Sequence, residues 1–265
     1  MRYLSACVPF LLPWHTYRRG SGVEYKKLQM QPRLAMIADM VPPGTRLADV
    51  GTDHGYLPVW LLQNGRIPSA IASDIRPAPL HHAKKTAQQY GLADRIDFRL
   101  CDGLAGLSPG EADTVVLAGM GGETISGILS AAKWTLTGDI TLLLQPMSKM
   151  EFLRKWLPEN GYAFLAERLV WDKDYLYPIF CVRGGKKSFL TPAQQYGGVL
   201  LEDDPLYGAY LNQQLRRLQT AIDGLSRSGD CFIREKAQPL QAIRQALQSE
   251  WEKKESEKHD TSQGC

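Results

Sequence analysis

The chain has 265 residues, of which 44% are hydrophobic and 22% charged, and its formal net charge is +3. Length and composition are those of a soluble globular protein with one good core and a smaller appendage. The mild positive charge permits a nucleic-acid partner but does not require one. No apolar run approaches the roughly 18 residues of a membrane-spanning helix, so we expect no membrane association.

The five cysteines lie far apart in the chain and form no C-x-x-C pair. An odd number at such spacings argues against a disulfide framework and against a zinc site. We therefore expect a cytoplasmic protein without a bound metal, and no motif indicates an obligate protein partner.

The first residues differ in character from the rest. A short apolar run over residues 8–14 is broken by two prolines, and only three residues precede "LSAC", too few for a lipoprotein signal. Arg18-Arg19-Gly20 fits a ribosome-binding tract in the gene, with Val23 as a GTG start. We expect residues 1–29 to be a non-native or disordered extension; CGN codons at both arginines would contradict the start-site hypothesis.

From residue 34 onwards, helices and strands are predicted to alternate. A first helix over 34–41 ends at Pro42-Pro43-Gly44. Five strands follow, over 46–50, 70–73, 96–100, 114–118 and 140–144, with helices over 56–63, 78–90, 123–132 and 148–159 between and after them. We expect Ser148 and Glu151 to form a capping box in the last of these helices. Two further strands, over 164–170 and 177–182, are joined by a turn at 172–174.

This alternation predicts an α/β fold with a doubly wound, seven-stranded sheet whose closing hairpin adds one antiparallel strand. Residues 30–187 are assigned to this domain. Residues 188–258 are predicted to form an antiparallel helical hairpin, because apolar residues recur at coiled-coil spacing. The first helix carries Leu211, Leu215, Leu218, Ile222 and Leu225, and the second Ile233, Ala237, Leu240, Ile243, Leu247 and Trp251. The chain is expected to fray from about Lys253, with 259–265 as a tail.

Polar or glycine-rich segments stand at the carboxyl end of every one of the first five strands. Ligands of open α/β sheets bind at this edge, so we expect these segments to form one site. They contain Asp49, Gly51, Asp53, His54 and Gly55 after the first strand, then Asp74, Asp102-Gly103, Gly119-Met120-Gly121-Gly122 and Gln145-Pro146.

The residue types suggest which ligand would fit. Glycines let a ligand approach the backbone closely. Asp74 lies 25 residues after Asp49 (74 − 49), where nucleotide-binding sheets hold ribose hydroxyls. Asp102 can accept a hydrogen bond from an exocyclic amine, and Asp49 and Asp53 can attract a cation. A nucleoside with a sulfonium tail would use all of them. A dinucleotide is favoured less, because Gly51 and Gly55 give G-x-x-x-G, not G-x-G-x-x-G.

The chain resembles the bacterial tRNA (adenine(22)-N(1))-methyltransferase family in five segments, in this order and spacing: "DVGTDHGYLP", "SDI", "CDGL", "AGMGGE" and "LLLQPM". The resemblance covers about Arg33 to Trp251. Several relatives carry Asn after "QP", where this chain has Met147, which puts a polar role for that position in doubt.

The resemblance implies a class I methyltransferase sheet, S-adenosylmethionine as cofactor, tRNA as partner and adenine N1 as the methylated atom. It implies that the cofactor is surrounded by Asp49, Gly51, Asp53, His54, Gly55, Tyr56, Asp74, Ile75, Asp102, Gly103, Leu104 and Gly119. It also implies that the target base and the transfer involve Asp53, Gly119, Met120, Gly121, Gln145 and Pro146.

The residues alone leave other functions open. The chain is also compatible with a methyltransferase for another RNA, a protein or a small molecule, or with a non-catalytic cofactor-binding or coiled-coil interaction protein. Individual residues have alternatives too. His54 is also interpretable as a helix cap, Tyr175 and Tyr177 as edge packing, and the hairpin arginines as a solvated helix face.

Overall fold

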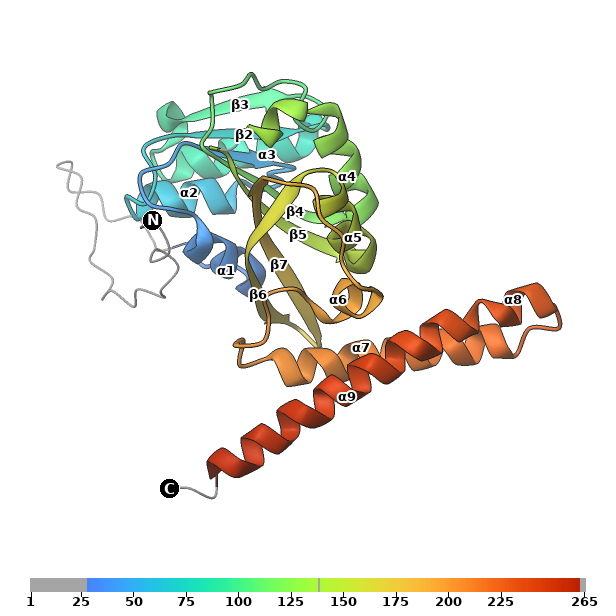
Figure 1. Cartoon of the computed structure of the whole chain (residues 1–265). Helices are drawn as coiled ribbons and strands as arrows, with labels where there is room; N and C mark the ends of the chain where they lie inside the picture. Colours follow the sequence, from blue (N-terminus) through green and yellow to red (C-terminus); the bar gives the residue numbers. More distant parts are fainter. Residues whose placement is uncertain (1–27, 138, 263–265) are drawn as a thin grey trace.

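The computed structural model describes residues 28–137 and 139–262. It contains a sheet with helices on both faces and a long helical hairpin that lies against one end of the sheet (Figure 1). We expect residues 1–29 to be a non-native or disordered extension. Residues 1–27 of that extension lie outside the described residues. Every helix in the described ranges is too short or too polar to cross a membrane.

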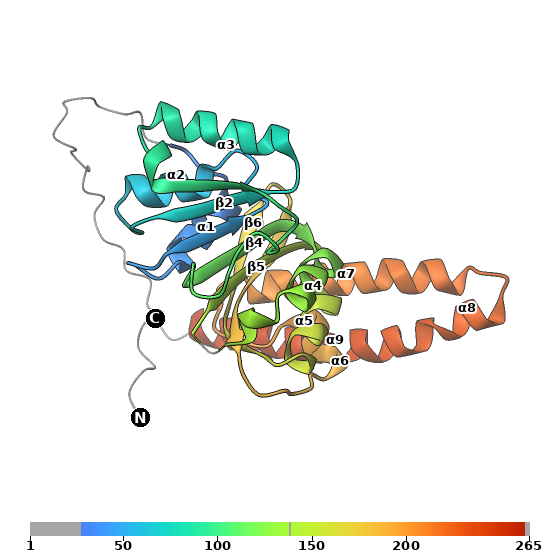
Figure 2. The same ribbon diagram turned by 90° about the horizontal axis from the view of Figure 1, so that it is seen from above.

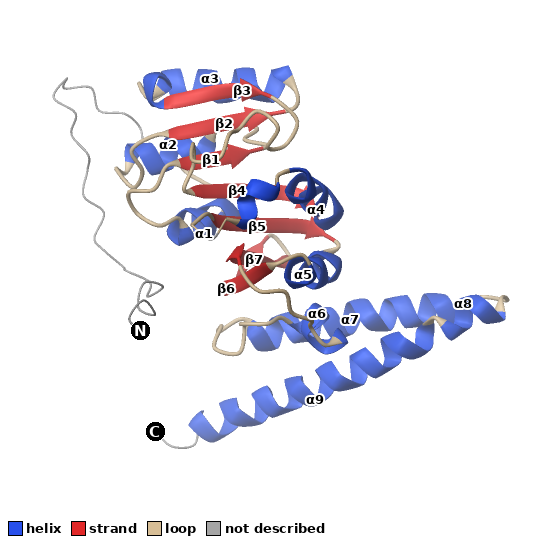
Figure 3. Ribbon diagram, turned by 45° about the horizontal axis from the view of Figure 1, so that its top comes forward, coloured by secondary structure: helices blue, strands red, loops and turns tan. Residues whose placement is uncertain are grey.

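The strands of the described ranges form one seven-stranded sheet in the order β3-β2-β1-β4-β5-β7-β6 (Figure 3). The strands from β1 to β5 pair in parallel, whereas β7 pairs antiparallel with both β5 and β6. This confirms the predicted doubly wound sheet with an antiparallel strand near its end. The strands are β1 (Leu47–Val50), β2 (Ala70–Asp74), β3 (Ile96–Leu100), β4 (Thr114–Gly121), β5 (Thr141–Ser148), β6 (Tyr162–Asp172) and β7 (Tyr175–Gly184).

Helices cover the two faces of this sheet as separate layers. Val116 packs into a cluster with α1 to α3, while its neighbours Val115 and Leu117 pack into the cluster of α4 and α5. Burial on both faces explains why the central strands are almost continuously apolar. The helices of these layers are α1 (Pro32–Met40), α2 (Tyr56–Gln63), α3 (Pro77–Gln89), α4 (Gly122–Ala131) and α5 (Met150–Glu159), with short 3₁₀ turns at Ala93–Arg95 and Lys133–Leu136.

Strands β2, β4, β5, β6 and β7 all reach further than the sequence pattern predicts, and at their carboxyl ends β4 and β5 do so by the most. β4 continues to Gly121 and β5 to Ser148, because irregular register beyond Ala118 keeps the two strands paired. The predicted capping box at Ser148 is therefore wrong, since Ser148 still belongs to β5. Helix α5 begins after Lys149, whose φ of 55° makes a left-handed turn between strand and helix.

The C-terminal helices form the predicted antiparallel hairpin, which projects away from the sheet (Figure 2). α7 (Tyr207–Ser226) and α9 (Ala237–Ser262) pair through the apolar seam, and α6 (Pro192–Gly197) and α8 (Cys231–Glu235) flank them. The prediction is wrong for Ile233, which lies on α8 and is 37% exposed, because the second long helix begins only at Ala237. The seam also includes Leu169 and Leu176 of the β6–β7 hairpin, so the helices dock on that end of the sheet. α9 is helical to Ser262, and the expected fraying from about Lys253 stays a prediction.

A buried ion pair joins the two parts of the molecule. Arg154 Nε on α5 donates to Glu167 Oε1 on β6 at 2.9 Å, and both side chains are fully buried. The second carboxylate oxygen accepts the backbone N–H groups of Val199 and Leu200, and Arg154 also donates to the Tyr210 hydroxyl on α7. Both charges are thus satisfied by groups from the sheet and from the helical region.

Candidate active site

The carboxyl ends of β1 to β5 lie at one edge of the sheet. β1 pairs with β2 on one side and with β4 on the other, so strand order reverses between β1 and β4. A crevice outside such a switch point is where open α/β sheets bind ligands. Nearly all residues that the sequence singled out lie in the turns or strand ends along this edge.

The turn after β1 brings the backbone close to this crevice. Gly51 has a φ of 74°, and the N–H groups of Gly51 and Thr52 donate to the Ser73 carbonyl at 2.8 and 2.9 Å. A side chain at Gly51 would clash with the methyl group of Met120 on β4. The left-handed backbone therefore favours glycine here, whereas the Met120 methyl group is the end of a flexible side chain that can move aside.

Two buried carboxylates face each other across the ends of β1 and β2. Asp49 and Asp74 are each only 6% exposed. The Thr52 hydroxyl donates to Asp49 at 2.6 Å, and the Arg76 N–H donates to Asp74 at 2.9 Å. Burial, reinforced by the charge of Asp74 and opposed by the Thr52 hydrogen bond, raises the pKa of Asp49 to about 6. Asp74 lies 3.8 Å from Nε of the exposed Arg76, so Asp49 is the carboxylate of the two whose burial is poorly compensated.

An aromatic stack stands at the mouth of the crevice. The His54 ring stacks on Tyr56 of α2 at 5.2 Å and on His82 of α3 at 5.1 Å. The neighbouring Asp53 has a φ of 50°, and its carboxylate lies 3.8 Å from His54 Nε2. The N-cap of α2 is Gly55, so the interpretation of His54 as the helix cap is wrong.

The ends of β2 and β3 add an apolar surface and an acceptor. Ile75 is 60% exposed directly after Asp74. Asp102 is exposed after β3, while Leu104 is buried beneath it. Gly103 has a φ of 52°, and a side chain there would meet Ile128 of α4 at 2.9 Å. An apolar face beside an exposed carboxylate suits the base of a nucleoside.

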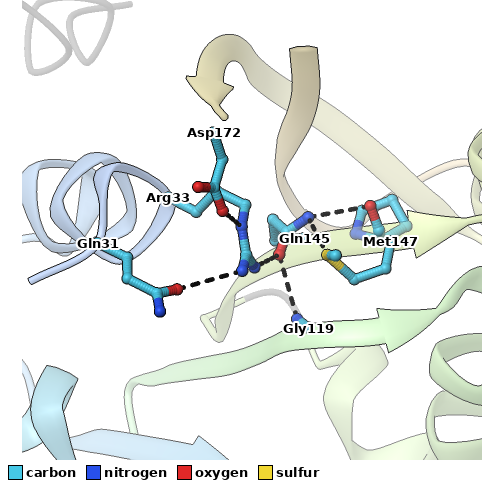
Figure 4. A network of polar contacts seen from close by, with 7 residues as sticks. Gln31, Arg33, Gly119, Gln145, Met147 and Asp172 are labelled. Atoms are coloured by element: carbon cyan, nitrogen blue, oxygen red, sulfur yellow. Dashed lines mark hydrogen bonds and ion pairs between the residues drawn. The ribbon is translucent and has the colours of Figure 1, made fainter. Parts of the chain in front are cut away.

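A polar network fixes the end of β5 (Figure 4). Gln145 is fully buried, and its Oε1 accepts from Arg33 Nη1 at 2.9 Å and from the Gly119 N–H at 3.2 Å. Its Nε2 donates to the Pro146 carbonyl at 3.0 Å and contacts the Met147 sulfur at 3.5 Å. Both ends of the amide are thus engaged within the protein, so Gln145 holds Gly119 and Pro146 in place.

Arg33 is the member of this network that sequence reasoning missed. It lies on α1, 112 residues before Gln145. Its Nε also pairs with Asp172 at the tip of the β6–β7 hairpin, and its guanidinium lies 5.5 Å from the Tyr177 ring. Because Arg33 can only donate, it fixes which end of the Gln145 amide points toward Gly119. No local pattern in the sequence signals these contacts.

The sheet order, the acids at the ends of β1 to β3 and the glycine-rich end of β4 define a Rossmann-like, S-adenosylmethionine-dependent methyltransferase. A family model described as "Methyltransferase domain" matches residues 30–180. The chain is also 32% identical, over 77% of its length and 89% of the relative, to the tRNA (adenine(22)-N(1))-methyltransferase of Bacillus subtilis. The chain belongs to the family of that enzyme, which confirms the resemblance found in the sequence.

Solved structures agree with this assignment. The crystal structure of the B. subtilis m1A22 tRNA methyltransferase TrmK has a TM-score of 0.75 and 30% identity, and the match covers 84% of this chain and 98% of that one. Streptococcus pneumoniae Sp1610, solved with S-adenosyl-L-methionine, has a TM-score of 0.71 and 31% identity, with 82% and 97% coverage. The expected fold class and cofactor are thereby confirmed; the individual site residues remain predictions.

Proposed function

We propose that this protein methylates N1 of adenine 22 in tRNA with S-adenosylmethionine as donor, and that it does so in the cytoplasm. The observation that carries the proposal is the pair of buried carboxylates, Asp49 and Asp74, at the edge of the sheet beside the glycine-rich end of β4. Sequence identity to an enzyme named for this reaction supports the choice of substrate.

The residues at the ends of β1 and β2 fit the cofactor. The Ser73 hydroxyl is buried and has no hydrogen-bond partner among the described residues. The raised pKa of Asp49 indicates a carboxylate that a cation would stabilise. Asp49 would hold the charged methionine end, Asp74 the ribose hydroxyls, and Ile75 with Asp102 the adenine ring.

When bound, the cofactor supplies a methyl group on a positively charged sulfur. Adenine N1 carries an in-plane lone pair, so no proton has to leave before it attacks and the chain needs no strong general base. The protein's task is to align the two atoms and to exclude water. Gly119 and Gly121 leave room for an extruded base at the end of β4.

The methylated adenine is cationic, so acceptors near its 6-amino group would stabilise the charge that develops. The backbone carbonyls of Ala118 and Gly119 and the exposed carboxylate of Asp53 are our candidates. Gln145 would act by positioning the backbone of Gly119, because its amide oxygen accepts a hydrogen bond from the Gly119 N–H.

Basic side chains of the helical hairpin are the candidate contacts to the tRNA backbone. Arg216, Arg227 and Arg234 are exposed on α7, after α7 and on α8. Such a row would neutralise phosphates without reading the sequence. A solvated helix face remains the alternative, and binding measured against salt concentration distinguishes the two.

Unmodified tRNA transcripts with adenine or guanine at position 22 test the proposal. Each is incubated with the protein and radiolabelled S-adenosylmethionine, then digested to nucleosides. Label in 1-methyladenosine from the adenine transcript alone is the expected result. Cofactor binding by calorimetry without label on this RNA would keep the fold but contradict the substrate. Label on another RNA or on a protein would support the broader methyltransferase alternative.

A further inference from the structure

A groove at the same edge of the sheet is not used by the proposed reaction. It has a volume of about 430 Å³, within the range of small-ligand sites. We call it the hairpin groove because it lies between the end of β5, the β6–β7 hairpin and helix α7. It is lined by Met147, Ser148, Lys149, Met150, Glu151, Tyr175, Tyr177 and Arg217.

The hairpin groove is continuous with the glycine-rich end of β4, where the target base is proposed to lie, but its two tyrosines stand further away. Ser148 pairs with Gly121, which connects the groove to the glycine-rich segment. Tyr175 and Tyr177 lie on β7, two strand positions from β4 in the order β4-β5-β7. Two spacings amount to roughly 10 Å, whereas reacting atoms must approach to roughly 3–3.5 Å. A base that lies against these tyrosines is therefore a neighbour of the reacting base and not the reacting base itself.

The lining has the chemistry of a site for a single nucleotide. The rings of Tyr175 and Tyr177 lie 4.7 Å apart at 51°, and both side chains are half-buried. Lys149 is exposed, and the Arg217 side chain is 38% exposed. Aromatic rings stack on bases of any sequence, and these two cations can meet a phosphate.

The acid of the groove is incompletely paired. Glu151 Oε2 is buried without a hydrogen bond among the described residues, and it lies 3.8 Å from Arg217 Nη2. Arg217 Nη1 donates instead to Gln214 at 2.8 Å. This oxygen is ion-paired with Arg217 but accepts no hydrogen bond among the described residues, so it has the capacity to accept one from an amino group on a base. With two cations and one acid, the groove keeps a net positive charge.

We propose that the hairpin groove binds the nucleotide adjacent to the target adenine when that adenine is extruded from the tRNA. The base would lie against the rings of Tyr175 and Tyr177, and its phosphate would contact Arg217 and Lys149. This rests on the proposed function, since it assumes that the substrate is a tRNA strand. It gives the two tyrosines a role beyond packing of a sheet edge.

The test uses adenine-22 transcripts with 2-aminopurine at position 21 or at position 23. S-adenosylhomocysteine is added to prevent turnover, and fluorescence is followed as full-length protein is added. We expect stacking to quench one of the two positions with wild-type protein and with Tyr175→Phe. Tyr175→Leu, which keeps the apolar volume, should lose the quenching. Phe189→Leu removes an 83% exposed ring outside the groove and should behave as wild type.

Steady-state methylation of the same transcripts separates the two proposals. Tyr175→Leu should raise the KM for tRNA by about 5- to 150-fold, the range expected for one stacked base, while its affinity for the cofactor stays unchanged. Methylation by wild type with no quenching at either position, or quenching that persists in Tyr175→Leu, would overturn the groove proposal alone. Wild type that leaves these transcripts unlabelled would contradict the proposed function itself.

The phosphate contact has its own readout. Arg217→Gln should weaken tRNA binding and reduce the slope of log Kd against log salt by about 0.7, the value for one contact to a single strand. Arg217→Lys keeps the charge and should restore the slope. An unchanged slope in Arg217→Gln would remove the phosphate from the proposed site.

Discussion

Replacing Asp49 with asparagine should stabilise the cofactor-free protein relative to wild type, and this difference should grow as the pH rises. Burial raises the pKa of Asp49 from 3.8 to about 6, so folding favours its protonated form. The stability that this group contributes is fully present below about pH 4 and is lost as the pH rises through 6. A difference of about 2.2 pKa units corresponds to about 3 kcal/mol, of which about 1.4 kcal/mol falls between pH 5 and 8.

Urea unfolding at pH 5, 6, 7 and 8 measures this effect. The free energy of unfolding of Asp49→Asn, relative to wild type, should increase by about 1.4 kcal/mol across that range, or roughly 3–6 °C in Tm. Asp113→Asn is the control: Arg46 lowers the pKa of Asp113, so its removal should destabilise the protein with little change above pH 5. A flat difference for Asp49→Asn, or a less stable variant at pH 8, would refute the reasoning.

The same substitution should have the opposite effect on the cofactor. Asparagine can still accept the Thr52 hydrogen bond but cannot balance a cation. We expect the affinities for S-adenosylmethionine and S-adenosylhomocysteine both to fall, as measured by calorimetry at pH 8, because both ligands carry the methionine ammonium group. Unchanged affinity for the two ligands would argue against a contact between Asp49 and the charged methionine end.

Three further variants test the scaffold. Arg154→Met leaves the buried Glu167 carboxylate unpaired and should lower the free energy of unfolding by about 3–5 kcal/mol in urea; a loss under 1 kcal/mol would contradict this. Gly51→Ala forces a left-handed alanine against Met120, costing about 1–2 kcal/mol, and should weaken cofactor binding in calorimetry; unchanged affinity would count against a cofactor-lining turn. Arg33→Met removes the hydrogen bond that orients the Gln145 amide at the end of β5. It should lower the single-turnover rate constant for methyl transfer about 10- to 100-fold and leave the cofactor affinity unchanged. An unaltered rate constant would exclude a positioning role.

Local sequence patterns determined the sheet and the position of its functional edge. Helix α2 occupies the predicted residues 56–63 and β3 the predicted residues 96–100. These elements depend on apolar periodicity and on glycines at their ends, which act over a few residues. The placement of acids after β1, β2 and β3 is equally local, because parallel strands always bring their carboxyl ends to one edge.

The tertiary structure alone decided which polar groups meet. The pairing of Arg33 with Gln145 depends on how α1 docks beside β5, and the pairing of Arg154 with Glu167 on how α5 packs against β6. The capping box predicted at Ser148 is wrong for the same reason, because the pairing of β4 with β5 extends the strand through Ser148. Such contacts join residues far apart in the chain, and their energy comes from burial that exists only once the layers have packed.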